Sequence, residues 1–185
     1  MIKKLLQFEL KFHSKQISFI VLFILFTAYG FLAINQGFKY LEFSSMYNDA
    51  FNLNFLSGIV SIISTFATVF LCINAALRDK LFNFEGLIFS TGIKKINFFL
   101  SRFLGVFLII LLLNTVAMLG VFIGTCINNL DPETLHQFNF THYFWPWLLL
   151  ILPNVFVITA IIFFVTALFN FCPLYKILGW STCKK

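Results

Sequence analysis

Four long runs of apolar residues limit what this chain can fold into. They cover residues 17–34, 55–77, 103–127 and 145–169, and none of them contains Asp, Glu, Lys, Arg or His. A transmembrane helix needs about 20 consecutive apolar residues to cross a hydrocarbon core of roughly 30 Å. A membrane-spanning β-strand would instead alternate apolar and polar residues over segments of roughly ten. The sequence therefore predicts an all-α, polytopic membrane helix bundle with four transmembrane helices.

Lysine and arginine are distributed unevenly between the segments that join these runs. Four precede the first run, five lie in residues 78–102 and three follow the last run, whereas residues 35–54 hold one and residues 128–144 hold none. Because cytoplasmic segments carry the excess of Lys and Arg, this predicts a multi-pass inner (plasma) membrane protein with cytoplasmic N- and C-termini. The net charge of +6 thus reflects topology, and such short basic segments do not favour a nucleic-acid partner.

Two shorter segments flank the predicted four-span domain, which covers residues 17–169. Residues 1–16 are basic and partly amphipathic, which predicts a cytoplasmic surface helix on the lipid membrane. The lysines expected to anchor this helix and contact lipid headgroups are Lys3, Lys4, Lys11 and Lys15. Residues 170–185 are too short and too polar for another span. We expect a cytoplasmic tail there, the product of a truncation or a frameshift.

The connector between the second and third runs, residues 78–102, carries seven charged residues. From Leu77 to Ile88 the pattern is that of an amphipathic helix, and Ser90-Thr91-Gly92 favours a turn. The second helix has a predicted apolar stripe of Ile93, Ile96, Leu100 and Phe103, with Lys94, Lys95, Ser101 and Arg102 facing away from it. The connector therefore predicts a cytoplasmic amphipathic elbow made of two short helices.

Small and weakly polar residues occupy one side of the second span. Those that fall within about 100° of one another on a helical wheel are Ser57, Ser61, Ser64, Thr65, Thr68, Cys72 and Ala75. Two interpretations stay open: close helix packing with the hydroxyls bonded to backbone carbonyls, or the lining of a pathway or cavity. In the third span, Asn114 is expected to satisfy its amide across a helix interface.

Proline interrupts the fourth run at Pro153. Because proline lacks a backbone N–H, it should kink this helix and free the carbonyl of Leu149. The neighbouring side chain of Asn154 is expected to help satisfy that carbonyl.

No residue pattern predicts a catalytic or a metal site. His136 and His142 are six residues apart and fit no ligand spacing with Asp131 and Glu133, so we interpret them as exposed loop residues. The four cysteines form no C-x-x-C pair and no Cys/His cluster. We therefore expect no cofactor and no enzymatic activity in this chain.

Several stretches of the chain resemble type 2 ABC exporter permeases, the membrane subunits of ATP-binding cassette transporters. Arg78-Asp79, Glu85 and the stretch LIFSTGIKKINFFLSRFLG from Leu87 to Gly105 resemble the first cytoplasmic loop and the following helix of that family. Asp131-Pro132-Glu133 and the stretch from Leu152 to Leu168 extend the similarity. The similarity covers most of residues 1–169 and is closest to bacterial permeases of the kind sometimes fused to a zinc aminopeptidase.

The resemblance implies a partial six-helix permease, with two permease halves per transporter and separate ABC ATPase subunits docked on the elbow. The positions that it assigns to this ATPase-coupling elbow are Arg78, Asp79, Glu85 and Gly86, together with Gly92, where the family usually has proline. The second span would face the pathway. We therefore expect a permease subunit that couples ATP hydrolysis by partner subunits to transport, paired with an identical or a different permease half.

Other classes of function stay open beside this expectation. The chain is alternatively a non-transporting membrane scaffold or assembly factor, or an inactive permease fragment. A membrane enzyme is disfavoured because no catalytic pair of residues lies at membrane depth, and because the His-Glu-x-x-His motif of zinc peptidases is absent.

Overall fold

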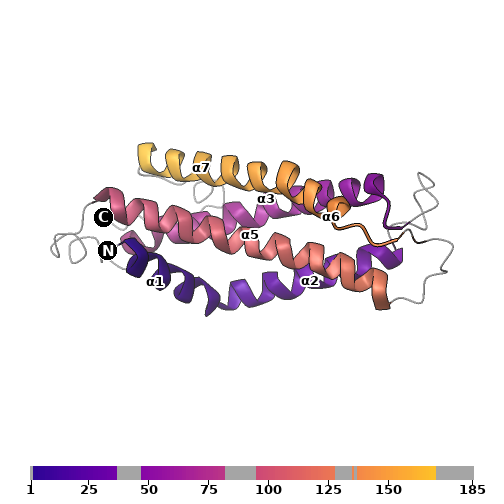
Figure 1. The fold of residues 1–185 in the computed structure, drawn as a ribbon. Coiled ribbons are helices and arrows are strands. Elements are labelled where there is room, and N and C mark those ends of the chain that lie inside the picture. Colours follow the sequence, from indigo (N-terminus) through magenta and orange to yellow (C-terminus); the bar gives the residue numbers. More distant parts are fainter. Residues whose placement is uncertain (1, 37–46, 82–94, 128–134, 136, 170–185) are drawn as a thin grey trace.

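A computed structural model of the chain describes residues 2–36, 47–81, 95–127, 135 and 137–169. Its elements are α1 (Ile2–Ser14), α2 (Ile17–Gln36), α3 (Ala50–Leu81), α5 (Lys95–Ile127), α6 (Phe140–Pro146), the π-helix η3 (Trp147–Ile151) and α7 (Leu152–Phe169). Figure 1 shows α2, α3, α5 and α7 running lengthwise beside one another. The described residues contain no strand, and the prediction of an all-α bundle is confirmed.

Four stretches of these helices are long and apolar enough to cross a membrane. They are Ile17–Ile34, Ala50–Ala75, Ile96–Ile127 and Phe140–Val165, and they overlap the four predicted runs. At 1.5 Å per residue, the 32-residue stretch of α5 is about 48 Å long and extends beyond a hydrocarbon core of roughly 30 Å. The division of the chain into surface segment, four-span domain and tail stays a prediction, since residues 170–185 lie outside the described part.

The other helices pack on α5. This helix contacts α1, α2, α3 and α7, and it lies in the middle of the bundle in Figure 1. Large apolar side chains along its length, among them Val106, Ile110, Leu113 and Val121, are fully buried. The core of the protein therefore follows α5 from one end of the bundle to the other.

Glycine residues allow α2 and α5 to approach closely. A Cβ atom on Gly30 would collide with the backbone oxygen of Ala117, and one on Gly120 would lie 2.8 Å from the backbone oxygen of Thr27. Both positions therefore require glycine for the two backbones to meet at this distance. Gly120 belongs to a Gly-x-x-x-Gly pattern in the third run, whereas Gly30 stands alone in the first run and had no such signal.

The N-terminal part of α5 turns its polar side inward, opposite to the prediction. Ser101 and Arg102 are 1% and 5% exposed, whereas Ile96 and Leu100 are 66% and 40% exposed. A helix surrounded by lipid places apolar side chains outward and polar ones against protein, the reverse of a helix in water. The assignment of Ser101 and Arg102 to an outward face was therefore wrong.

The chain accommodates Pro153 through the π-helix η3 that precedes it. The N–H of Leu152 donates to the carbonyl oxygen of Trp147, five residues earlier, which shifts the backbone register by one residue. The side chain of Asn154 donates to Ser61 of α3 instead of compensating for Leu149, so the expected use of this amide was wrong. The amide of Asn154 thus joins α7 to α3.

Phenylalanine rings hold α7 against α5. The ring centroid of Phe103 lies 5.8 Å from those of Phe156 and Phe163, and Phe107 lies 5.8 Å from Phe156, all nearly edge to face. Each such pair contributes about 0.5–1.5 kcal/mol beyond its area of contact. Aromatic contacts of this kind stabilise the interface between the N-terminal half of α5 and α7.

Candidate functional site

The polar stripe of α3 lies inside the bundle. The side chains of Ser57, Ser61, Ser64 and Thr68 are buried, and that of Thr65 is partly buried. The hydroxyls of Ser57, Thr65 and Thr68 donate to carbonyl oxygens four residues earlier, at 2.7, 3.1 and 2.7 Å. These bonds satisfy the hydroxyls within α3, so the stripe can contact other helices without an unpaired donor. The choice between packing and a pathway stays a prediction at this point.

Two amide side chains reach this stripe from neighbouring helices. Asn114 Nδ2 of α5 donates to Ser64 Oγ at 2.8 Å and to the carbonyl oxygen of Ile110 at 2.8 Å. Asn154 Nδ2 of α7 donates to Ser61 Oγ and, at 3.4 Å, to the carbonyl oxygen of Ser61. Ser61, Ser64, Asn114 and Asn154 together are termed the polar seam. The polar seam joins α3 to both α5 and α7, and it gives Asn114 its predicted partner on another helix.

Glu9, His13 and Arg102 form a buried ion cluster where α1 packs on α5. Glu9 Oε1 lies 3.4 Å from Arg102 Nε, and Glu9 Oε2 lies 3.8 Å from His13 Nε2. Arg102 Nη1 also donates to the carbonyl oxygen of Ala75 at 2.8 Å, where the apolar stretch of α3 ends. The guanidinium carbon lies 4.6 Å from the ring centroid of Phe98. Arg102 therefore joins α1, α3 and α5.

The sequence held a signal for the ion cluster that the prediction did not use. On a helical wheel Glu9 lies between Leu5 and Leu6, in the middle of the apolar side of α1. A carboxylate in that position is buried and needs a cation beside it, and Arg102 borders the third run. A Cβ on Gly105 would lie 2.8 Å from the Cβ of Glu9, so this glycine allows α1 to approach α5.

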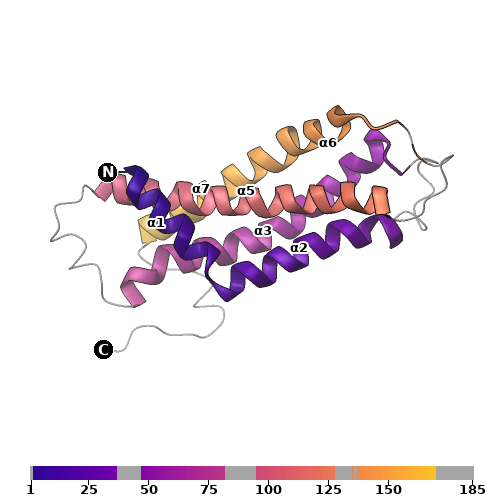
Figure 2. The ribbon, with the colours of Figure 1, turned by 60° about the horizontal axis from the view of Figure 1, so that its bottom comes forward.

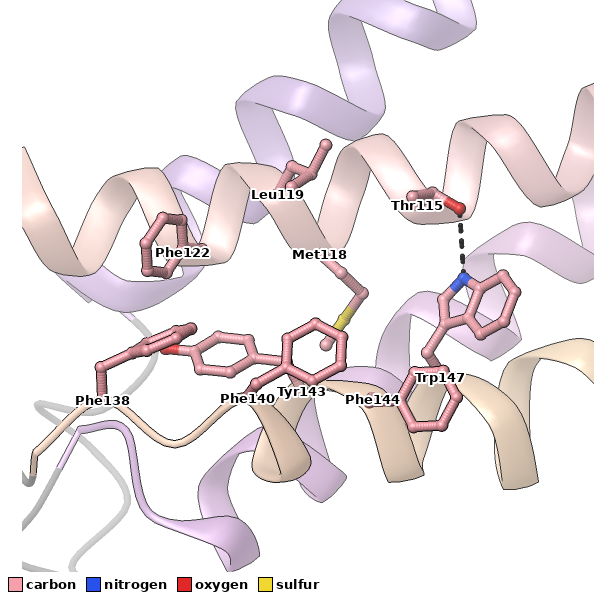
Figure 3. A pocket seen from close by; sticks show the side chains of 9 residues that line it. All are labelled: Thr115, Met118, Leu119, Phe122, Phe138, Phe140, Tyr143, Phe144 and Trp147. Atoms are coloured by element: carbon pink, nitrogen blue, oxygen red, sulfur yellow. Dashed lines mark hydrogen bonds between the residues drawn. The ribbon is translucent and has the colours of Figure 1, made fainter.

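An apolar pocket of about 380 Å³ lies between α5 and the polypeptide around α6 (Figure 3). The lining side chains are Thr115, Met118, Leu119 and Phe122 of α5 and, opposite them, Phe138, Phe140, Tyr143, Phe144 and Trp147. The indole Nε1 of Trp147 donates to Thr115 Oγ1 at 3.2 Å and connects the two walls. Because these nine residues include no carboxylate, imidazole or thiol and one phenol, that of Tyr143, the pocket is suited to hold an apolar group.

The predicted ATPase-coupling residues lie at the end of α3 and in the stretch of sequence that follows it. Arg78 and Asp79 lie in the last turns of α3. Glu85, Gly86 and Gly92 lie within residues 82–94, outside the described residues, as does most of the predicted elbow.

Of Asp131, Glu133, His136 and His142, which were weighed as metal ligands, only His142 lies within the described residues. The ring of His142 lies 3.3 Å from the side-chain amide of Asn139 and 3.4 Å from the carbonyl oxygen of Asn48, and His136 is not described. Across the described ranges, no three His, Cys, Asp or Glu side chains come close enough to hold a metal ion. The described residues thus offer a polar seam, an ion cluster and an aromatic pocket as candidate sites.

Part of the chain matches the model of a known protein family. Residues 140–185, about a quarter of the chain, match the family model described as the transmembrane domain of YgaP-like inner membrane proteins. No curated protein and no solved structure matches the chain. Together with the four apolar spans, the match confirms the predicted multi-pass inner-membrane location.

These comparisons contradict the identification of the chain as a type 2 ABC permease. The stretch from Leu152 to Leu168, which contributed to that resemblance, falls within the match to YgaP-like proteins, and nothing matches an ABC transporter. An ABC ATPase and a second permease half are unsupported as partners, and the coupling role of the elbow loses its basis. The physical reason is that apolar helices flanked by a few charges have similar compositions in many membrane-protein families.

Proposed function

We propose that this chain is a non-transporting scaffold or assembly factor of the inner membrane, without enzymatic activity of its own. The polar seam is the observation that carries the proposal. In the bundle interior, Asn114 and Asn154 use their amides to bind hydroxyls of α3. A transport route needs such groups to face water or cargo, whereas these groups face one another. The stripe of α3 therefore serves helix packing in this proposal.

The outer surface of the bundle supports the same proposal. Large apolar side chains on the membrane-spanning helices, such as Ile24, Ile62, Phe66 and Ile161, are more than half exposed. In a bilayer they contact acyl chains or the helices of another membrane protein. An interior joined by hydrogen bonds, combined with such a surface, suits a protein that holds other membrane segments in place.

Accessibility of thiols to a charged, membrane-impermeant reagent tests the proposal. Cys72 lies on the stripe of α3 and is fully buried, so it is a native probe once Cys126, Cys172 and Cys183 are replaced by serine. A second probe is Ser61→Cys in a background that also carries Cys72→Ala. Neither thiol should react in sealed vesicles of either orientation, and both should react after denaturation in detergent.

Exposed positions provide the matched controls. Lys11 on α1 and Gln137 before α6 are exposed, and Lys11→Cys and Gln137→Cys should each react from one side of the membrane. Reaction of Cys72 or of Ser61→Cys in the folded protein would show an aqueous route beside α3. That outcome would overturn the proposal.

A further inference from the structure

The exposed side of α1 carries only positive charge. Lys3, Lys4 and Lys11, and Lys15 just after the helix, are all exposed. Glu9, the one acidic residue in this segment, is 2% exposed and lies against Arg102 of α5. The ion cluster therefore removes the segment's one negative charge from its surface.

Helix geometry places these lysines opposite Glu9. With 100° per residue, Lys3, Lys4 and Lys11 all lie at least 120° from Glu9 around the helix axis. Within the described ranges, no carboxylate forms an ion pair with Lys3, Lys4, Lys11 or Lys15. Their ammonium groups are thus available to an anion from outside the chain.

The position of α1 in the fold brings this face to a membrane surface. Figure 2 shows α1 inclined to the long helices at one end of the bundle. It directly precedes the membrane-spanning stretch that begins at Ile17, and it packs on the N-terminal part of α5. Phe8 is 58% exposed and lies one turn from both Lys4 and Lys11, so an apolar ring accompanies the charges. An exposed aromatic ring beside lysines is typical of helices that lie in the headgroup region.

We propose that this face of α1 binds the headgroups of anionic phospholipids. The argument is charge complementarity: four exposed lysines meet phosphate-bearing lipids whose leaflet carries a negative surface potential. Because Glu9 is buried against Arg102, it does not repel anionic lipid from this face of α1. The inference is independent of the proposed scaffold function, since it concerns the surface of α1 and not the bundle interior.

Native mass spectrometry of the full chain in a non-ionic detergent tests this proposal. The purified protein is mixed with equal amounts of phosphatidylglycerol and phosphatidylcholine, and the ratio of the two bound lipids is measured. The wild-type chain should bind more phosphatidylglycerol than phosphatidylcholine. A variant with Lys3→Gln, Lys4→Gln, Lys11→Gln and Lys15→Gln should lower the ratio at least tenfold, because each lysine near such a surface contributes about fivefold in affinity.

Two matched variants separate charge from folding. Replacing the same four lysines by arginine keeps the charge and should keep the ratio. Gln7→Ala with Ser14→Ala changes exposed, uncharged residues of the same segment and should also leave it unchanged.

Three results would overturn the proposal. The wild-type chain could bind both lipids equally, the glutamine variant could keep the wild-type ratio, or the Gln7 and Ser14 variant could lose the ratio to the same extent. The proposal would also be overturned if the chain showed no preference for phosphatidylglycerol but bound an acidic protein through these lysines. The partner of this face would then be a protein.

Discussion

The ion cluster and the polar seam both join helices through buried polar side chains, but they use different chemistry at different depths. Glu9 and Arg102 of the ion cluster carry formal charges. Arg102 contacts α3 at Ala75, where the apolar stretch of α3 ends. The polar seam uses neutral amides and hydroxyls near the middle of the apolar stretches, whereas Arg102 lies close to the start of the stretch that begins at Ile96. A charge at the bilayer centre costs about 2.5–3.5 kcal/mol on insertion scales. The charged side chains thus lie near the end of an apolar stretch, where a charge costs less, and the neutral ones lie in the middle.

The two regions also differ in how many helices depend on one side chain. Arg102 bonds or contacts groups on α1, α3 and α5, whereas Asn114 and Asn154 each bond one residue of a neighbouring helix. Loss of Arg102 also leaves the charge of Glu9 buried, while loss of an amide leaves only a neutral hydroxyl. We therefore expect the ion cluster to be the more sensitive region, and the following substitutions test that difference.

Arg102→Ala should have the largest effect. It removes the cation from a buried ion pair and should lower the free energy of unfolding by about 3–5 kcal/mol. Reversible unfolding in mixed detergent and SDS micelles, followed by circular dichroism, measures the change. Lys11→Ala, on the exposed side of α1, is the control and should stay within about 0.5 kcal/mol of wild type. If Arg102→Ala lowered the free energy of unfolding by less than Asn114→Leu does, the ion cluster would not be the more sensitive region.

Gly30→Ala should have the next largest effect, although it touches neither polar region. Its Cβ would collide with the backbone oxygen of Ala117, so α2 must move away from α5 at a cost of about 1–3 kcal/mol. Gly58→Ala is the matched control, since nothing lies within 4 Å of its Cβ. That change should be neutral or stabilise α3 by up to about 1 kcal/mol, because alanine favours helix more than glycine does. Equal effects of the two variants in the same unfolding assay would contradict a close approach at Gly30.

Asn114→Leu should cost less than either of these changes. It removes the bonds to Ser64 and Ile110, and such contacts between membrane helices average about 0.6 kcal/mol, with a maximum near 1.7. Among the described residues Asn114 Oδ1 has no hydrogen-bond partner, so removing that buried acceptor offsets part of the loss. Ser64→Ala, which removes only the hydroxyl partner, is the companion variant. A destabilisation as large as that of Arg102→Ala would show that depth does not separate the two regions.

Trp147→Phe should have the smallest effect. It removes the hydrogen bond from the indole to Thr115, a contact at the exposed edge of the aromatic pocket, and replaces the half-buried indole by a smaller aromatic ring. A net loss of about 0.5 kcal/mol is expected for such a bond. Thr115→Val also removes the bond that the Thr115 hydroxyl donates to the carbonyl oxygen of Leu111 at 2.8 Å, so its loss should be somewhat larger. The losses of the two variants should not add in the double variant, since both remove the same indole bond.

The sequence predicted the four helices because the length and apolar character of a span are local properties. It also placed Asn114 at a helix interface, since an amide at membrane depth needs a partner. The pairing of Glu9 with Arg102 escaped prediction because the two residues come together only when α1 packs on α5. Arg102 was moreover assigned outward by the rule for helices in water, which is reversed beside lipid. The resemblance to permeases failed for a related reason, since apolar composition identifies the membrane and not the family.

A double-mutant cycle on Glu9 and Arg102 tests most directly whether buried polar side chains hold these helices together. The unfolding free energies of wild type, Glu9→Gln, Arg102→Gln and the double variant are measured in the same mixed micelles. The two losses should be coupled by on the order of 1–3 kcal/mol, and the double variant should be more stable than Arg102→Gln alone, because no charge is then left buried without its partner. Losses that add within about 0.5 kcal/mol would contradict the account, because the ion pair would then contribute nothing to joining α1 and α5.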